Sequence, residues 1–146
     1  MKIIKTLIVD DDLAFRRFLK EFLSDKPGLE VIGEAPDGRI ALEKVEKIKP
    51  DLVLLDIRMP RIDGFTALYM LKRKYPQVKI IILTIFDDPI YVDSAIKNGA
   101  AGYVVKSNLV KDLMPAIWAA LRIEKEKAGC AKRFMADPER TPPRKL

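Results

Sequence analysis

The stretch Leu52-Val53-Leu54-Leu55-Asp56 joins four consecutive apolar residues to a carboxylate. An unbroken apolar run of this length is typical of a strand that is covered on both faces, as in the centre of a parallel sheet. Two further runs, Leu7-Ile8-Val9 and Ile80-Ile81-Ile82-Leu83, have the same character. The sequence therefore predicts a parallel sheet whose central strands are buried between two layers.

Strand-length apolar segments alternate with helical patterns along the whole chain. We expect strands over residues 3–9, 29–35, 51–55, 78–83 and 101–105. Apolar residues spaced three and four apart predict helices over residues 13–24, 39–48, 64–74, 89–98 and 108–127. Because right-handed crossovers place helices on both faces of a parallel sheet, this alternation predicts a doubly wound α/β fold.

Local capping signals agree with these boundaries. Asp37 and Asp88 stand where helix N-caps are needed, and Pro89 follows at a first-turn position. Gly99 stands just after the fourth predicted helix, where glycine commonly ends one.

The composition indicates one folded domain with a short tail. Of the 146 residues, 49% are hydrophobic and 33% are charged, a balance that can fill a core and keep a wetted surface. The helical pattern stops near Lys127. We therefore expect a domain over residues 1–127 and a basic, proline-containing tail or linker over residues 128–146.

The same composition argues against several classes of protein. Cys130 is the single cysteine and the chain has no histidine, which excludes an internal disulfide and disfavours zinc chemistry. No apolar run approaches the roughly 18 residues of a membrane span, so we expect a cytoplasmic protein with no membrane contact. Residues 127–146 contribute +4 of the net charge of +6. The small remainder predicts no nucleic-acid binding by the chain itself.

Reactive side chains stand at the carboxyl ends of four of the five predicted strands. Strand one is followed by Asp10-Asp11-Asp12, strand three by Asp56, strand four by Thr84 and strand five by Lys106. In such folds ligands bind beyond these ends, so the side chains are expected at one rim. Converging carboxylates repel one another unless a cation joins them, and oxygen ligands without His or Cys favour Mg²⁺. With a lysine and a hydroxyl beside it, the set is suited to forming an aspartyl phosphate.

Residues 1 to about 127 resemble a bacterial response-regulator receiver domain of two-component signalling. The pieces that carry the resemblance are Leu7-Ile8-Val9-Asp10-Asp11, Leu54-Leu55-Asp56-Ile57-Arg58-Met59-Pro60, Asp63-Gly64, Leu83-Thr84 and Gly102-Tyr103-Val104-Val105-Lys106-Ser107. No single piece is specific, but together they are. The resemblance implies a flavodoxin-like fold with strand order 2-1-3-4-5.

The resemblance also implies a role for each residue at the rim. Asp56 would accept a phosphoryl group from a sensor histidine kinase. Asp11, Asp56 and the backbone carbonyl of Arg58 would bind Mg²⁺, and Asp10 would support the metal through water. The implied phosphoryl-binding and switch residues are Thr84, Lys106 and Tyr103, with Tyr103 as an aromatic switch coupled to Thr84.

One choice of register and two departures refine this comparison. Either Asp10-Asp11 or Asp11-Asp12 could be the metal pair, and the position of Arg16 matches the family pattern for the first. Ser107 stands where family members often have proline, and a Lys-Ser pair resembles the subfamily with a C-terminal helix-turn-helix domain (NarL/LuxR-like). Ile85 stands where they often have a small residue, which makes it a candidate gate to the phosphoacceptor.

The implied function is a phosphoacceptor switch, not an enzyme beyond self-phosphorylation and self-dephosphorylation. Phosphorylation would change the face formed by helix four, strand five and helix five, through which a homodimer could also form. The short tail cannot make a helix-turn-helix domain, so DNA would be bound only through a C-terminal domain that this chain lacks. A stand-alone receiver acting by protein contacts is the alternative.

Other readings of the same residues stay open at this point. Asp56 alone could be a helix cap or a surface ion pair, and Tyr103 alone could be a core aromatic residue. An aspartate-nucleophile phosphohydrolase is a further alternative, but such enzymes generally need a second carboxylate two residues later, where Arg58 stands. A nucleotide- or flavin-binding module is disfavoured because no glycine-rich phosphate loop follows the first strand.

Overall fold

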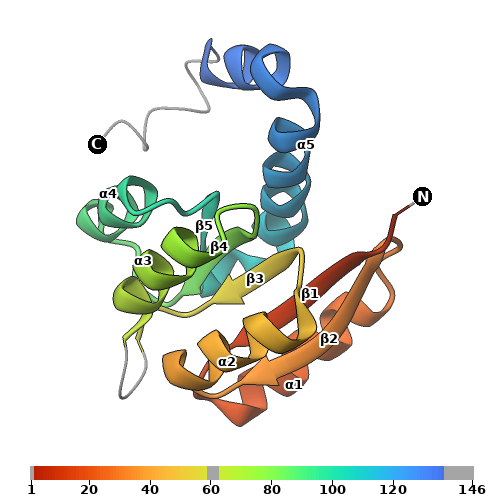
Figure 1. Ribbon diagram of the computed structural model, residues 1–146, viewed down its shortest axis with the longest axis vertical. Helices are drawn as coiled ribbons and strands as arrows, with labels where there is room; N and C mark the ends of the chain where they lie inside the picture. Colours follow the sequence, from red (N-terminus) through yellow and green to blue (C-terminus); the bar gives the residue numbers. More distant parts are fainter. Residues whose placement is uncertain (1, 59–62, 137–146) are drawn as a thin grey trace.

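Five parallel strands form the centre of the molecule in the computed structural model, which describes residues 2–58 and 63–136 (Figure 1). The strands are β1 (Ile4–Val9), β2 (Leu29–Ala35), β3 (Leu52–Leu55), β4 (Lys79–Thr84) and β5 (Gly102–Val105). Their order across the sheet is β2-β1-β3-β4-β5, and every neighbouring pair is parallel. The expected fold and strand order are confirmed. Met59-Pro60 of the family motif and residues 137–146 of the expected tail lie outside the described residues.

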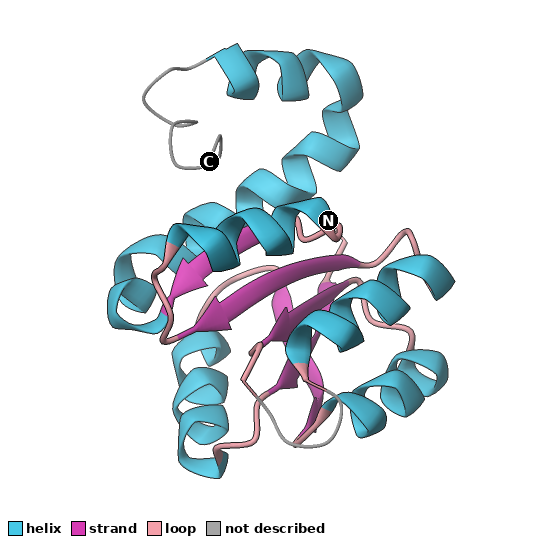
Figure 2. Ribbon diagram, turned by 90° about the vertical axis from the view of Figure 1, so that its left-hand side faces the viewer, coloured by secondary structure: helices cyan, strands magenta, loops and turns pink. Residues whose placement is uncertain are grey.

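Helices cover both faces of this sheet (Figure 2). They are α1 (Leu13–Ser24), α2 (Gly38–Ile48), α3 (Gly64–Lys74), α4 (Pro89–Lys97) and α5 (Leu109–Ala136), with a short 3₁₀ turn over Lys106–Asn108 before α5. Neighbouring residues of β1 point to opposite faces, as the two-residue period of a strand requires. Leu7 and Val9 pack in the core layer beneath α2, α3 and α4. Ile8 packs in the layer beneath α1 and α5.

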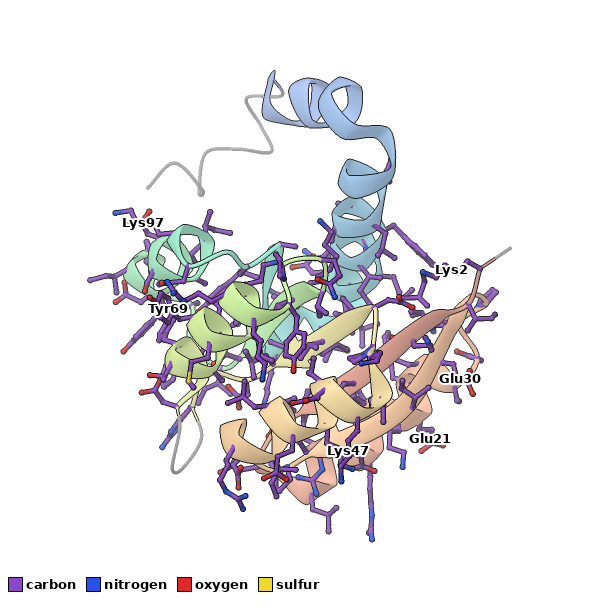
Figure 3. All side chains as sticks on the ribbon, in the orientation of Figure 1. Lys2, Glu21, Glu30, Lys47, Tyr69 and Lys97 are labelled. Atoms are coloured by element: carbon purple, nitrogen blue, oxygen red, sulfur yellow. The ribbon has the colours of Figure 1, made fainter. Side chains whose placement is uncertain are left out.

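The helix starts follow the predicted capping chemistry. The side chains of Asp37 and Asp88 accept hydrogen bonds from backbone N–H groups in the first turns of α2 and α4, and Pro89 occupies the first turn of α4. Gly99 has a φ of 101°, a left-handed conformation that glycine adopts without a steric penalty. Charged residues of the outer helix faces point away from the sheet, as Figure 3 shows for Lys47 on α2 and Lys97 on α4.

The last helix is longer than its sequence pattern predicted. We expected an end near Lys127, but α5 continues to Ala136. The amphipathic pattern stops at Lys127, yet the following residues are mostly good helix formers, and the next proline is Pro138. The boundary between a domain over residues 1–127 and a linker over residues 128–146 stays a prediction. In the part of the chain that the structure describes, no helix is long and apolar enough to cross a membrane.

Candidate functional site

The carboxyl edge of the sheet collects the predicted reactive residues. Val9 pairs with Leu55, so the residues that follow them, Asp10 and Asp56, lie side by side where β1 and β3 end. The backbone N–H of Asp56 donates to the Val9 carbonyl across this junction at 3.0 Å. Lys106 follows β5 at the same edge, since the carboxyl ends of parallel strands meet there.

Three carboxylates form a compact oxygen cluster at this edge. Asp10 and Asp56 are buried, with 2% and 6% of their surfaces exposed, while Asp11 is exposed to solvent. One carboxylate oxygen from each of the three residues lies within 4.8 Å of the others. Such a set of hard oxygen donors can hold a divalent cation, with room for waters or a further oxygen ligand.

The three consecutive aspartates have two roles, because Asp10 and Asp11 belong to the carboxylate cluster and Asp12 begins the helix that follows. Asp12 is the N-cap of α1, and its carboxylate accepts hydrogen bonds from the N–H groups of Ala14 and Phe15 at 3.0 and 3.3 Å. The N–H of Asp12 in turn donates to Asp10 Oδ1 at 2.8 Å. This arrangement favours Asp10-Asp11 over Asp11-Asp12 as the metal pair.

Lys106 places a positive charge against the two buried carboxylates. Its Nζ lies 2.7 Å from Asp10 Oδ2 and 3.3 Å from Asp56 Oδ2. Burial would lower the pKa of Lys106, but the hydrogen bond to Asp10 and the charge of Asp56 outweigh it, so the pKa lies above its ordinary value. Burial raises the pKa of Asp10 more than Lys106 lowers it. Burial thus opposes the charged form of Asp10, while the Lys106 ammonium stays charged.

Thr84 and Tyr103 are connected to each other through one residue of the loop after β4. The Thr84 side chain is fully buried, and its Oγ1 accepts a long hydrogen bond of 3.4 Å from the N–H of Phe86. The Tyr103 hydroxyl donates to the Phe86 carbonyl at 2.8 Å. Burial, with the charge of Asp87 adding to it, raises the pKa of Tyr103 to about 12. A movement of this loop would therefore change the hydrogen bonds of both side chains.

An open cavity of about 580 Å³ lies over the carboxylates. Its lining residues are Asp10, Asp11, Asp12, Asp56, Arg58, Ile85 and Lys106. Ile85 is 56% exposed at this opening, which is where a gate to Asp56 would have to stand. The backbone N–H of Arg58 donates to Asp56 Oδ1 at 3.1 Å, so the residue expected to supply a metal-binding carbonyl lies at the site.

Sequence reasoning missed two residues that shape the site. Phe15 lies within the predicted helix over residues 13–24 and was not singled out, but its ring centroid lies 4.0 Å from Lys106 Nζ. Glu34 on β2 accepts a hydrogen bond of 2.8 Å from Arg16 Nε, and Arg16 also donates to the backbone carbonyl of Asp10. No local sequence pattern marks Glu34 as part of the site, because its partner Arg16 lies on α1.

Gly64 of the Asp63-Gly64 motif is the first residue of α3, at a place where a side chain does not fit. A Cβ atom on Gly64 would lie 2.1 Å from the Cα of Ile57 and 2.4 Å from the carbonyl oxygen of Asp56. The Gly64 N–H also donates to the Ile57 carbonyl at 3.0 Å. The start of α3 is thus pressed against the backbone of the predicted phosphoacceptor.

Comparison with known proteins adds an independent observation. The family model described as "Response regulator receiver domain" matches residues 6–118. "Transcriptional regulatory protein DegU" of Brevibacillus brevis is 40% identical over 114 residues, which are 78% of this chain and 48% of that protein. "Response regulator protein VraR" of Staphylococcus aureus is 36% identical over 78% of this chain and 54% of its own length. The chain thus spans about half the length of the curated relatives it matches.

Solved structures show the same likeness. A LuxR-family two-component response regulator from Aurantimonas superposes with a TM-score of 0.79 at 28% identity, covering 83% of this chain and 86% of that one. The response regulator domain of Thermotoga maritima CheB gives a TM-score of 0.76 at 28% identity, covering 83% and 98%.

Proposed function

The chain belongs to the response regulator receiver family, and on that premise we propose that it is a phosphorylation switch whose acceptor is Asp56. One observation carries the proposal. The buried carboxylate of Asp56 follows the end of β3 and lies 3.3 Å from the Lys106 ammonium, and one of its oxygens lies within 4.8 Å of an oxygen of Asp10 and of Asp11. A nucleophile, a fixed cation and a cation-binding oxygen set therefore share one open cavity.

The proposed reaction is a phosphoryl transfer to a carboxylate. A carboxylate oxygen of Asp56 forms the new P–O bond while the P–N bond of a phosphohistidine on a sensor histidine kinase breaks. The electron pair of the broken bond stays on the imidazole nitrogen. The Lys106 ammonium offsets the negative charge on the phosphoryl oxygens, and the Arg58 N–H orients the attacking carboxylate by its hydrogen bond to Oδ1.

We further propose that Asp10, Asp11 and Asp56 hold Mg²⁺, with the Arg58 carbonyl as an added ligand. The donor set fits this ion because it consists of carboxylates and lies in a chain without histidine. When bound, the ion would neutralise phosphoryl oxygens as a Lewis acid. Asp11 is the exposed member of the set and so the one placed to meet an arriving cation, while Asp10 is fixed by its hydrogen bonds to Asp12 and Lys106.

The proposed output is a change in the face made by α4, β5 and α5. Thr84 would turn toward the phosphoryl group that the Lys106 ammonium already faces, and Tyr103 would respond through Phe86, which both it and Thr84 contact. Receiver domains of this kind typically belong to DNA-binding regulators. We propose that this one controls such a domain or, alternatively, acts alone by protein contacts. Exposed apolar residues on α4 and α5, such as Ile90 and Val110, support a homodimer through this face, which sizing by light scattering with and without phosphorylation tests.

Receiver domains of response regulators are typically signalling proteins, not enzymes. For this chain we propose only self-phosphorylation and self-dephosphorylation, in the cytoplasm. Ile85, exposed beside the cavity, would slow the approach of water or donor to Asp56.

The test is phosphorylation by the small donor acetyl phosphate in the presence of Mg²⁺, followed by intact-protein mass spectrometry. We expect wild type to gain one phosphoryl group and Asp56→Asn to gain none. Asp51→Asn is the matched control because Asp51 lies at the opposite end of β3, where its carboxylate accepts from the Lys5 N–H and contacts Lys2. Equal labelling of wild type and Asp56→Asn, or no labelling of wild type, would overturn the proposal.

A further inference from the structure

Phe15, in the first turns of α1, turns the face of its ring toward the Lys106 ammonium. Lys106 Nζ lies 4.0 Å from the ring centroid. The Lys106 side chain is only 15% exposed, and Phe15 is half-buried against the core layer between the sheet and α1 and α5. At this distance the negative face of an aromatic ring attracts a cation, and more strongly where water is displaced.

The ammonium is therefore enclosed by three groups of two kinds. Two are carboxylates, Asp10 at 2.7 Å and Asp56 at 3.3 Å, and the third is the Phe15 ring. A lysine side chain has four rotatable methylene bonds and otherwise keeps much freedom. If the ammonium left the carboxylates, it would also lose its contact with the ring.

The position of the ring is coupled to the loop that carries the acidic cluster. The Phe15 N–H donates to the Asp12 carboxylate at 3.3 Å, and Asp12 in turn donates its N–H to Asp10. On the other side, the Phe18 ring lies 6.0 Å from that of Phe15. The start of α1 thus aligns both the Asp10 carboxylate and the Phe15 ring against one lysine.

We propose that Phe15 is a positioning residue that holds the Lys106 ammonium where it meets a phosphoryl group on Asp56. The inference rests on the proposed function, because it assigns Phe15 a part in the same reaction. We assign Phe15 no direct part in the bond changes, because it acts through Lys106.

The same helix provides a matched control. Phe22 also packs against the core layer beneath α1, and Lys26 Nζ lies 4.3 Å from the centroid of its ring. Phe22→Leu therefore removes an equivalent ring and an equivalent ammonium contact, but away from the cavity. Phe15→Leu keeps an apolar side chain at the site and removes the aromatic face, while Phe15→Trp keeps that face.

The experiment measures two quantities by NMR in each variant. The first is the chemical shift of the Lys106 methylene protons in the free protein, which a ring at this distance displaces upfield. The second is the affinity for beryllofluoride with Mg²⁺. In Phe15→Leu we expect the displacement to vanish and the affinity to fall about three- to tenfold, as the loss of a partly desolvated cation–π contact predicts. Phe15→Trp should keep both, and Phe22→Leu should change only the Lys26 signals.

The outcomes separate this inference from the proposed function. Unchanged affinity in Phe15→Leu, or an equal loss in Phe22→Leu, would overturn the positioning role. Undisplaced Lys106 signals in wild type would overturn it as well, whether or not the mimic binds. If wild type showed the displaced signals but bound no beryllofluoride, the proposed function would fail and the positioning role in phosphorylation would fail with it.

Discussion

Replacing Gly64 by alanine should destabilise the protein and impair its site, although alanine is ordinarily the better helix residue. The added Cβ would lie 2.1 Å from the Cα of Ile57. Ordinary contacts of a Cβ atom begin near 3.4 Å, so this distance is about 1.3 Å too short. All three clashing atoms, the Cα and carbonyl carbon of Ile57 and the carbonyl oxygen of Asp56, belong to the backbone, so no rotamer change relieves the overlap. Either α3 or the end of β3 must move.

The magnitude follows from two opposing contributions. Overpacking of a closely packed region costs about 1 to 3 kcal/mol, and the backbone-to-backbone clash places Gly64→Ala at the upper end of that range. Alanine also restricts the unfolded chain more than glycine does, which raises the free energy of unfolding by about 0.4 to 1 kcal/mol. We expect a net loss of about 2 kcal/mol in the free energy of unfolding, which for a chain of this size lowers Tm by about 5 °C.

Two other glycines make a graded series for urea unfolding. A Cβ on Gly33 would lie 3.0 Å from the flexible Cδ1 end of Ile48, so Gly33→Ala should cost less. A Cβ on Gly102 would meet nothing closer than 3.4 Å, so Gly102→Ala should be nearly neutral. Because the same clash reaches the Asp56 carbonyl at 2.4 Å, Gly64→Ala should also slow labelling by acetyl phosphate. Equal stability of the Gly64 and Gly102 variants would refute the reasoning.

Three further outcomes are expected. Asp12→Ala should lower the free energy of unfolding by about 1 kcal/mol in urea titrations and Asp12→Asn much less, because Asp12 caps α1; equal losses would contradict this. Hydrogen bonds from Lys20 and Arg16 hold the pKa of Glu34 below its ordinary value, so its stabilisation is present above about pH 4.5 and disappears as the pH falls through the folded pKa. Glu34→Gln should therefore lower the free energy of unfolding at neutral pH by under about 1 kcal/mol, since the Glu34 side chain is partly exposed and solvent screens its ion pairs. This difference from wild type should close in acid, and an unchanged difference would argue against the ion pairs. With the pKa of Tyr103 at about 12, ultraviolet titration should show nearly the same phenolate absorbance in wild type and Tyr103→Phe up to about pH 11. The two curves should diverge only above that pH. An earlier divergence would show that the Tyr103 hydroxyl is not buried and bonded to the Phe86 carbonyl.

Much of the fold could be predicted because its determinants are local. Three apolar runs indicated strands buried on both faces, and the structure places Leu7 and Ile8 in opposite core layers. Asp37 and Asp88 indicated helix starts, because an aspartate side chain satisfies N–H groups only a few residues away. The end of α5 was the least predictable boundary, since a helix can continue beyond its amphipathic pattern where the following residues are good helix formers.

The candidate site was predictable as a set of residues but not as a set of contacts. Asp10, Asp56 and Lys106 were identified because each follows a strand, and parallel strands end at a common edge. Their pairing was not predictable, since Lys106 and Asp10 are 96 positions apart and meet only because β5 and β1 share one sheet. Phe15 illustrates the same limit, because an apolar residue on a helix reads as core until its neighbour is known.

By itself, the sequence determined which segments are strands and helices, which residues begin the helices, and which reactive groups stand at strand ends. Each of these follows from the spacing and chemistry of residues near one another in the chain. Only the tertiary structure decided that Lys106 is shared by two carboxylates and an aromatic ring, and that Gly64 must lack a side chain beside Ile57. These contacts depend on how elements pack across the sheet, and packing distances of a few ångströms are not encoded in any local pattern.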